Sequence, residues 1–313
     1  SGRQSVVVGT APSMDGFVSD SSSMISRGVK CTIYDPSPIA VVADTDIMAA
    51  APMRLLWAGL GDMLAKSISV CEWRISNLIT GEYYCEEVAA MMRRSLSQIV
   101  AQAGNIPTRD PDAIGRVAEG LVLSGVAMAY AGTSRPASGL EHYFSHMWEM
   151  FAIERGERSE LHGIQVGVGT LLALRLYDWI KQIKPDRERA LRHMHGFDAA
   201  AWEAQIRRLF GSAAGAILEI ERRTRKNDRA RHAVRLSRIV SNWDDILRII
   251  EEELPGYQTV YEMMAGVGMP TAPADLGIGK DRVRDALIGA RDIRDKYLSC
   301  SLLWDLGLLE EFA

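Results

Sequence analysis

The stretch Ala51 to Lys66, APMRLLWAGLGDMLAK, decides the fold because the pattern of the sequence changes there. Pro52 suits the start of a helix, and Leu56, Leu60 and Leu64 then recur at helical spacing along one apolar face. Helical periodicity begins just before this stretch and continues to the end of the 313-residue chain. The sequence therefore predicts a mainly α-helical protein.

Further helices are expected wherever apolar residues keep the 3.6-residue period between turn-forming pairs such as Lys184-Pro185 and Pro255-Gly256. Neither an internal repeat nor a low-complexity tract interrupts the pattern. The predicted helices cover residues 86–102, 111–130, 140–151, 162–183, 199–225, 231–254 and 281–303.

The N-terminal part of the chain has a different character. Val6 to Val8 and Ile39 to Val42 are short β-branched runs that predict buried strands, and Cys31 to Tyr34 could add another. Thr10 to Ser26 is dense in Ser, Gly, Asp and Pro and is predicted to be a loop. Two or three strands cannot form a self-sufficient parallel sheet, because such sheets need helices on both faces. We therefore expect an incomplete α/β unit and then a helical domain, over residues 1–46 and 47–313.

The composition of the chain argues against several classes of protein. With 47% hydrophobic and 24% charged residues and a net charge of −4, the chain is typical of a globular protein and carries no overall basic field for nucleic acid. The longest nearly uncharged stretch, Gly120 to Gly132, has 13 residues, fewer than the ~20 of a membrane span. The four cysteines are spread without pairing motifs, and residues 1–4 do not resemble a signal peptide. We expect a cytoplasmic protein with no nucleic-acid partner and no membrane span.

Asp62, His142 and His162 stand out as polar residues within apolar helical sequence. Carboxylate oxygen and imidazole nitrogen suit zinc or a similar divalent ion, and three protein ligands leave a position open for substrate. His146, one helical turn after His142, could be a fourth ligand or a proton donor. The alternatives are a hydrogen-bonded structural Asp and an incidental pair of histidines. The order Glu141-His142 differs from the HExxH signature, so a metalloprotease is excluded.

The charged segment between Arg222 and Arg238 contains none of the candidate metal ligands. We interpret it as a solvated helix-to-helix turn or an oligomer contact, because no aromatic residues for base stacking are interleaved and residues 251–253 that follow are acidic. A phosphate or nucleic-acid patch is the alternative. The segment has one acidic residue, Asp228, and eight basic ones: Arg222, Arg223, Arg225, Lys226, Arg229, Arg231, Arg235 and Arg238.

Four motifs occur together in this order: GTAPSMDGF at 9–17, GLGD at 59–62 continuing to Lys66, SRPASGLEHYFSH at 134–146, and HGIQVGVGT at 162–170. Together they resemble the glycerol-1-phosphate dehydrogenase family, which belongs to the metal-dependent alcohol dehydrogenase and dehydroquinate synthase-like superfamily. The 134–146 block is long and specific, whereas HGxxVxxG is shared across the superfamily.

The resemblance implies a dehydroquinate synthase-like fold and an NAD(P)-linked enzyme of phospholipid biosynthesis. Its reaction would interconvert dihydroxyacetone phosphate and sn-glycerol 1-phosphate, with a polyol phosphate as small-molecule partner and a homo-oligomer as the expected assembly. The implied metal is zinc first, with nickel or iron also compatible. The implied metal ligands are Asp62, His142 and His162; the cofactor-binding residues are Thr10, Ser13, Asp15 and Ser19; the catalytic residues are Asp15 and His146; the substrate contacts are Lys66 and His146.

One departure from the family pattern is large. Family members carry, before the TAPSxDG loop, a nucleotide-binding region with a Gly-rich turn that holds the dinucleotide pyrophosphate, and this sequence lacks a counterpart. We therefore expect residues 1–46 to be a remnant of a dinucleotide-binding domain and residues 47–313 to bind metal and substrate. We also expect weak NAD(P) binding and little activity from this chain alone. The alternatives are a 3-dehydroquinate synthase-like enzyme, a glycerol dehydrogenase-like enzyme, and a non-catalytic truncated scaffold.

Overall fold

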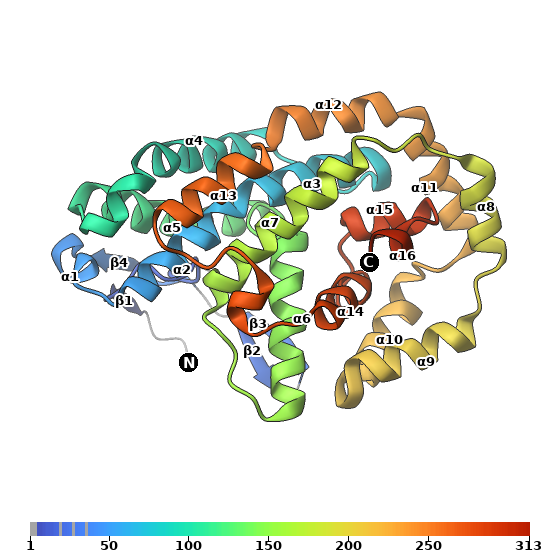
Figure 1. Ribbon diagram of the computed structural model, residues 1–313, viewed down its shortest axis with the longest axis horizontal. Helices are drawn as coiled ribbons and strands as arrows, with labels where there is room; N and C mark the ends of the chain where they lie inside the picture. Colours follow the sequence, from blue (N-terminus) through green and yellow to red (C-terminus); the bar gives the residue numbers. More distant parts are fainter. Residues whose placement is uncertain (1–4, 19–20, 27–28, 35–36) are drawn as a thin grey trace.

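The strands of the protein lie at its N-terminal end. The computed structural model describes residues 5–18, 21–26, 29–34 and 37–313 (Figure 1). Within them, β1 (Val6–Gly9) pairs in parallel with β4 (Ala40–Ala43), and β2 (Ser21–Ser26) pairs antiparallel with β3 (Val29–Tyr34). The described strands thus make two separate two-stranded sheets.

The predicted loop over residues 10–26 was wrong for its last part, where β2 forms. The Ser-rich sequence of β2 has no β-branched run that would predict a strand. Its conformation comes from backbone pairing with β3, in register from Ser21 with Tyr34 to Ser26 with Val29. Pairing with a neighbour outweighs strand propensity here, as it often does in sheets.

From Thr45 onward the described chain is helical, which confirms the prediction of a mainly α protein. Three short 3-10 segments, at residues 103–108, 211–213 and 273–276, join some of the helices. The α-helices are α1 (Thr45–Ala49), α2 (Met53–Leu64), α3 (Lys66–Thr80), α4 (Glu86–Gln102), α5 (Pro111–Ala131), α6 (Leu140–Arg155), α7 (His162–Ile180), α8 (Arg187–His195), α9 (Ala199–Phe210), α10 (Ala214–Thr224), α11 (Arg229–Ser241), α12 (Trp243–Glu253), α13 (Tyr257–Gly266), α14 (Lys280–Ala290), α15 (Ser299–Asp305) and α16 (Leu309–Phe312).

The predicted helices 199–225, 231–254 and 281–303 are each divided in two. Gly211, with φ of 47°, ends α9 in a backbone conformation that glycine adopts readily, and Asn242 separates α11 from α12. The sequence also failed to predict α8, because its nine residues include only two buried ones, Ala190 and Met194. A helix with so few apolar positions shows little periodicity.

The helices are arranged around the crossing of α2 and α7, where two backbones touch. A Cβ atom on Gly163 would lie 1.9 Å from the carbonyl oxygen of Ala58, and one on Gly59 would lie 1.8 Å from that of Pro12. Only glycine permits such approaches. The contacts bring α2, the start of α7 and the loop after β1 together.

Glu72 of α3 fixes the start of two other helices. Its carboxylate accepts hydrogen bonds from the backbone N–H of Leu140 at 2.8 Å and of Ser299 at 2.8 Å, the first residues of α6 and α15. Burial and the nearby Glu141 carboxylate raise the pKa of Glu72 to about 7, although hydrogen bonds from Ser299 and Leu140 oppose the rise. The direction in which α6 leaves this junction sets the position of its histidines.

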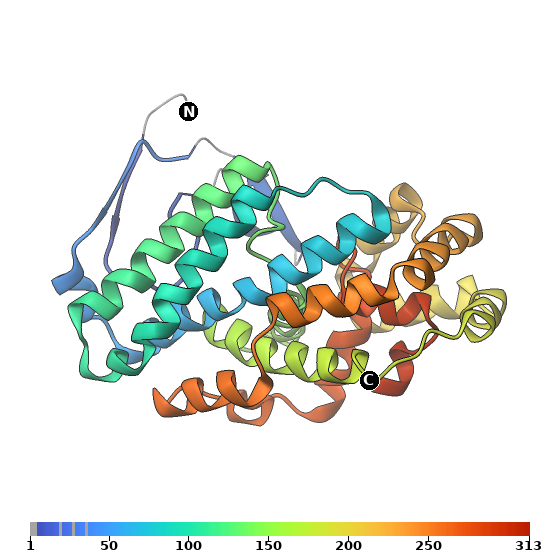
Figure 2. The ribbon, with the colours of Figure 1, turned by 90° about the horizontal axis from the view of Figure 1, so that it is seen from above.

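Figures 1 and 2 show that the molecule is elongated, with β1, β4 and α1 at one end and α8 to α10 at the other. Cys71, Cys85 and Cys300 are free thiols, and the side chain of Cys31 lies outside the described part. By length and hydropathy, α5 is the one described helix that could cross a membrane, but 56% of its most apolar window is buried inside the fold. Burial of this extent is typical of a helix in a protein core.

Candidate metal centre

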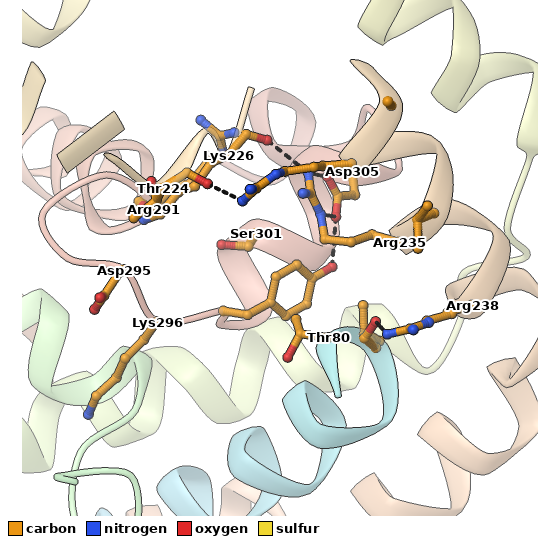
Figure 3. A pocket seen from close by; sticks show the side chains of 15 residues that line it. Thr80, Thr224, Lys226, Arg235, Arg238, Arg291, Asp295, Lys296, Ser301 and Asp305 are labelled. Carbon is orange, nitrogen blue, oxygen red and sulfur yellow. Dashed lines mark hydrogen bonds and ion pairs between the residues drawn. The ribbon is translucent and has the colours of Figure 1, made fainter. Parts of the chain in front are cut away.

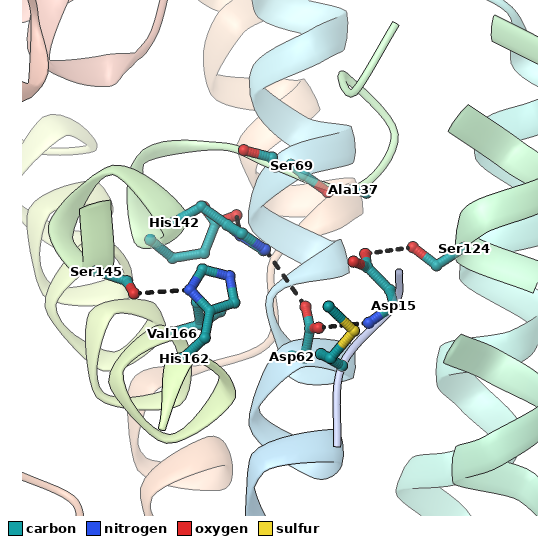
Figure 4. Close-up of polar contacts among 12 residues, drawn as sticks. Asp15, Asp62, Ser69, Ser124, Ala137, His142, Ser145, His162 and Val166 are labelled. Carbon is teal, nitrogen blue, oxygen red and sulfur yellow. Dashed lines mark hydrogen bonds and ion pairs between the residues drawn. The ribbon is translucent and has the colours of Figure 1, made fainter. Parts of the chain in front are cut away.

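Three helices and one loop bring the predicted metal ligands together (Figure 4). Asp62 lies in the last turn of α2, His142 in the first turn of α6, and His162 is the first residue of α7. Asp62 is fully buried, His142 is 5% exposed, and the His142 and His162 rings are 5.3 Å apart between centroids. The loop after β1 closes the group, because the backbone N–H of Asp15 donates to Asp62 Oδ2 at 3.0 Å.

The contact between Asp62 and His142 tests whether a metal ion fits. His142 Nδ1 lies 2.8 Å from Glu141 Oε1, so the carboxylate holds the ring proton on Nδ1 and leaves Nε2 as an acceptor. That Nε2 faces Asp62 Oδ1 at 3.3 Å. Two acceptors so close need a cation or a proton between them, and two ligand atoms bound ~2.0–2.1 Å from one tetrahedral zinc are about 3.3 Å apart. The residues present fit a metal ion.

The pKa values of this pair follow from the same contact. Burial by itself lowers the pKa of His142, but when a proton rather than a metal ion lies between the pair, hydrogen bonds from the ring to Asp62 and Glu141 outweigh burial and raise the pKa above its ordinary value. Burial by itself raises the pKa of Asp62, but Lys66 and His142 hold it well below its usual range. The carboxylate is therefore ionised and able to bind a cation.

A buried lysine bridges two carboxylates of this site. Lys66 is 1% exposed, and its Nζ donates to Asp15 Oδ2 at 2.7 Å, to Asp62 Oδ1 at 2.9 Å and to the Ala137 carbonyl oxygen at 3.1 Å. Burial by itself lowers the pKa of Lys66, but the carboxylates outweigh it and raise the pKa. Ser124 Oγ also donates to Asp15 Oδ2 at 2.8 Å. The three hydrogens of the ammonium group are thus directed at groups of the chain itself.

His162 is oriented by two groups on α6. Its Nδ1 lies 2.9 Å from Ser145 Oγ and 3.2 Å from Glu149 Oε1, and its side chain is 28% exposed. The His146 ring stacks on the His162 ring at 5.6 Å between centroids. With Nδ1 bound in this way, Nε2 of His162 is the nitrogen that remains for a metal ion.

Glu149 is the residue that the sequence analysis missed. His146, Glu149 and His162 each offer one ligand atom, and these atoms all lie within 4.8 Å of one another. A signal was present in the sequence, because His142, His146 and Glu149 follow the i, i+4, i+7 spacing of one helix face. This spacing alone does not identify Glu149 as a site residue, because a glutamate near the middle of a helix is usually solvated.

The predicted cofactor-binding residues are less closely grouped. Thr10 directly follows β1 and is exposed, Ser13 is half-buried on the same loop, and Asp15 lies against Lys66 and Asp62. Ser19 lies outside the described residues. The structure therefore brings together Asp15, Asp62, Lys66, His142, His146 and His162, and places Thr10 and Ser13 on the loop that leads to them.

Comparison with known proteins gives this arrangement a context. The family described as iron-containing alcohol dehydrogenase matches residues 1–52. A curated glycerol-1-phosphate dehydrogenase (NAD(P)+) from Bacillus licheniformis is 31% identical over 304 residues, which are 97% of this chain and 63% of the relative. One from Methanosarcina acetivorans is 40% identical over 172 residues, 55% of this chain and 47% of the relative.

Solved structures share the fold at lower identity. Glycerol dehydrogenase from Schizosaccharomyces pombe has a TM-score of 0.56 at 16% identity, covering 99% of this chain and 63% of its own. A probable glycerol dehydrogenase from Sinorhizobium meliloti 1021 has a TM-score of 0.53 at 19% identity, covering 99% of this chain and 71% of its own. The chain spans less than two thirds of the length of the curated relatives named above. Its sequence is similar to those of the glycerol-1-phosphate dehydrogenases, as its four motifs predicted, and it shares the fold of these two solved structures.

Proposed function

We propose that this chain supplies the metal-binding and substrate-binding part of an NAD(P)-linked oxidoreductase that interconverts dihydroxyacetone phosphate and sn-glycerol 1-phosphate. The observation that carries the proposal is the pair of facing acceptors, His142 Nε2 and Asp62 Oδ1, at 3.3 Å beside His162. The names of the curated relatives support the choice of reaction.

Asp62, His142 and His162 would hold a zinc, nickel or iron ion, which as a Lewis acid polarises the carbonyl of the substrate. The chain's own residues prepare this step. Glu141 fixes the proton on His142 Nδ1, and Ser145 and Glu149 bind Nδ1 of His162. Each contact sets a ring orientation and leaves Nε2 as the acceptor.

We assign His146 the proton that the C2 oxygen of the substrate gains on reduction. It is 8% exposed, stacks on His162 and has Glu149 Oε2 at 3.9 Å from its Nδ1. An imidazole has an ordinary pKa of ~6.5 and suits proton transfer near neutral pH. Its place beside a ligand brings it close to the atom that needs the proton.

For Lys66 and Asp15 we propose positioning roles. The resemblance implied that Lys66 contacts the substrate. The ammonium group of Lys66, however, already donates hydrogen bonds to Asp15, Asp62 and Ala137. We infer that it holds Asp62 ionised and ties the loop of Asp15 to α2. In this arrangement Thr10, Ser13, Asp15 and Ser19 remain the residues proposed to contact the cofactor.

We further propose that residues 1–46 form the remnant of a dinucleotide-binding domain and residues 47–313 the metal- and substrate-binding domain. Among the described residues, β1 pairs in parallel with one strand, β4, and no Gly-rich turn joins β1 to a helix. That turn is the usual device for holding a pyrophosphate. The 313-residue chain alone should therefore bind NAD(P) weakly. We also propose that the protein is cytoplasmic and forms a homo-oligomer.

Metal analysis combined with assays tests the proposal. The purified chain should contain a stoichiometric divalent ion, His162→Ala should lose it, and His195→Ala, at an exposed position on α8, should keep it. Unchanged metal content in His162→Ala would refute the ligand assignment. Assays with dihydroxyacetone phosphate, glycerol and the dehydroquinate synthase substrate test the reaction, and turnover of either of the last two alone would support the alternatives. Tight NAD(P) binding would contradict the proposed weak cofactor grip.

A further inference from the structure

A cavity of about 510 Å³ is lined by residues that take no part in the metal centre (Figure 3). The end of α3, the face of α11 and the segment 291–301 enclose it. Its volume is in the range of sites that bind small molecules, roughly 300–1,000 Å³. The cavity uses part of the basic segment 222–238, which the sequence analysis interpreted as a solvated turn or an oligomer contact.

The lining of this basic cavity carries an excess of positive charge. Among the described residues that line it, the carboxylates are Asp295 and Asp305, whereas six side chains are cationic. Three of the six lie on one face of α11 at the i, i+4, i+7 spacing, an arrangement that costs stability through like-charge repulsion. The six are Lys226, Arg231, Arg235, Arg238, Arg291 and Lys296.

Several of these cations bond to neutral groups. Two of the six have carboxylate partners: Arg235 pairs with Asp305 by two hydrogen bonds of 2.7 and 2.8 Å, and Arg291 pairs with Asp292 at 3.1 Å. Arg231 donates to the carbonyl oxygen of Thr224 at 2.6 Å, and Arg238 to that of Ile79 at 3.0 Å. A carbonyl oxygen satisfies an N–H donor without neutralising the charge of the side chain.

The two lysines of the cavity have lowered pKa values, and burial is the main cause of both shifts. Burial lowers the pKa of Lys226 to about 8, although the charge of Asp292 opposes the fall; Arg291 adds to it. Burial, joined by Arg135 and Arg294, lowers the pKa of Lys296 well below its ordinary value. An anion bound near either lysine would oppose these shifts.

The rest of the lining is apolar or bears hydroxyl groups. Val234, which is 53% exposed, lies beside the cations, and Thr80 and Ser301 add hydroxyls that can accept or donate. Tyr297 also lines the cavity and donates its OH to Asp305 Oδ2 at 2.9 Å. Such a lining suits a ligand with an anionic group and an apolar or ring-shaped body.

We propose that this basic cavity binds a small organic phosphate, with the phosphate held by Arg231, Arg238 and Lys226 and the body of the ligand against the exposed Val234. Arginine and lysine are the side chains that bind phosphate by charge-assisted hydrogen bonds. The proposal is independent of the proposed enzyme function. Arg231 and Arg238 are exposed and donate to the carbonyl oxygens of Thr224 and Ile79, so they can turn toward a ligand at little cost.

Titration calorimetry with adenosine 5′-monophosphate and adenosine tests the proposal on the 313-residue chain. The phosphate form should bind saturably, and adenosine about tenfold or more weakly, because the charged contacts are lost. Arg231→Gln with Arg238→Gln should weaken binding of the monophosphate by about tenfold or more. The control pair Arg187→Gln with Arg192→Gln removes the same charge from exposed sites on α8 outside the cavity and should leave binding unchanged.

The outcomes separate this site from the metal centre. His162→Ala should bind the monophosphate as the wild type does, whatever happens to its metal content. Absence of saturable binding by the wild type would overturn the proposal, and so would equal affinities in the two double variants. A change in oligomeric state of Arg231→Gln/Arg238→Gln with unchanged monophosphate binding would also overturn it and identify the cavity face as an oligomer contact.

Discussion

The metal centre and the basic cavity each contain a lysine whose ammonium group is hydrogen-bonded within the chain. The partners of the two ammonium groups differ, and the pKa values of the two lysines are shifted in opposite directions. Lys66 Nζ lies 2.7 Å from Asp15 Oδ2 and 2.9 Å from Asp62 Oδ1, and its pKa is raised. Lys226 Nζ donates to the carbonyl oxygens of Arg291, at 2.7 Å, and of Arg294, and its pKa is lowered to about 8. One charge is neutralised within the chain, and the other is only hydrogen-bonded.

The difference indicates what each region is built to do. A buried ion pair is rigid and leaves no charge for a small-molecule anion, so Lys66 suits the task of positioning Asp62. A cation that meets only carbonyl oxygens keeps its attraction for an anion. The lysine pair therefore separates a site prepared for a metal ion from one prepared for a phosphate.

The largest predicted effect comes from removing each lysine in turn. Lys66→Met leaves Asp15 and Asp62 without their buried cation and should lower the free energy of unfolding by about 3–5 kcal/mol. Lys226→Met removes a charge whose hydrogen bonds go to the carbonyl oxygens of Arg291 and Arg294, and should change that free energy by about 1 kcal/mol or less. Urea unfolding of both variants with EDTA present measures the contrast. Equal losses would show that the two lysines do not differ in the way described.

The second prediction concerns backbone contact at the metal centre. Gly163→Ala places a Cβ 1.9 Å from the Ala58 carbonyl oxygen and must push α7 away from α2, so it should cost roughly 3 kcal/mol by overpacking. Gly215→Ala is the control outside the metal centre, because a Cβ on this exposed residue of α10 meets nothing within 4 Å. It should be neutral or stabilising by up to ~1 kcal/mol, since alanine favours a helix. The midpoint temperature of thermal unfolding and the metal content should both fall in Gly163→Ala, and neither should fall in Gly215→Ala.

How far the sequence predicted these regions depends on whether the decisive interaction is local. The bounds of α4, residues 86–102, and the first residues of α6 and α7 followed from periodicity and motifs. The three bonds of Lys66 were beyond prediction because Asp15 and Ala137 approach it from distant parts of the chain. The basic cavity was also missed, because its cations face α3 and the segment 291–301, which are remote in sequence.

Glu149 gives the third prediction, on metal affinity. Glu149→Gln keeps the length of the side chain but removes the charge that faces His162 Nδ1 at 3.2 Å. Loss of such a contact to a ligand typically weakens metal binding by about 10- to 100-fold, and the same loss is expected here. Competition with a chromophoric chelator measures the affinity.

Glu154, on the same helix, supplies the matched control. Its carboxylate accepts a hydrogen bond from Ser212 Oγ at 2.9 Å, outside the metal centre, so Glu154→Gln should leave metal affinity unchanged. Glu149→Asp keeps the charge and should recover part of the affinity. If Glu149→Gln bound metal as tightly as the wild type, Ser145 alone would be enough to orient His162.

The smallest predicted effect is the pH dependence that Lys226 gives to stability. The pKa of Lys226 is about 8 in the folded chain, and its ordinary value of 10.5 applies to the unfolded chain. Between pH 8 and pH 10.5 the unfolded chain therefore binds more protons than the folded chain. The free energy of unfolding therefore rises with pH in this window. From pH 7 to pH 9 the gain attributable to Lys226 is about 1 kcal/mol. The difference between the wild type and Lys226→Met, measured by urea unfolding at both pH values, isolates it. A saturating phosphate ligand should reduce the gain, because an anion in the basic cavity stabilises the protonated lysine, whereas the metal centre offers no such coupling through Lys66.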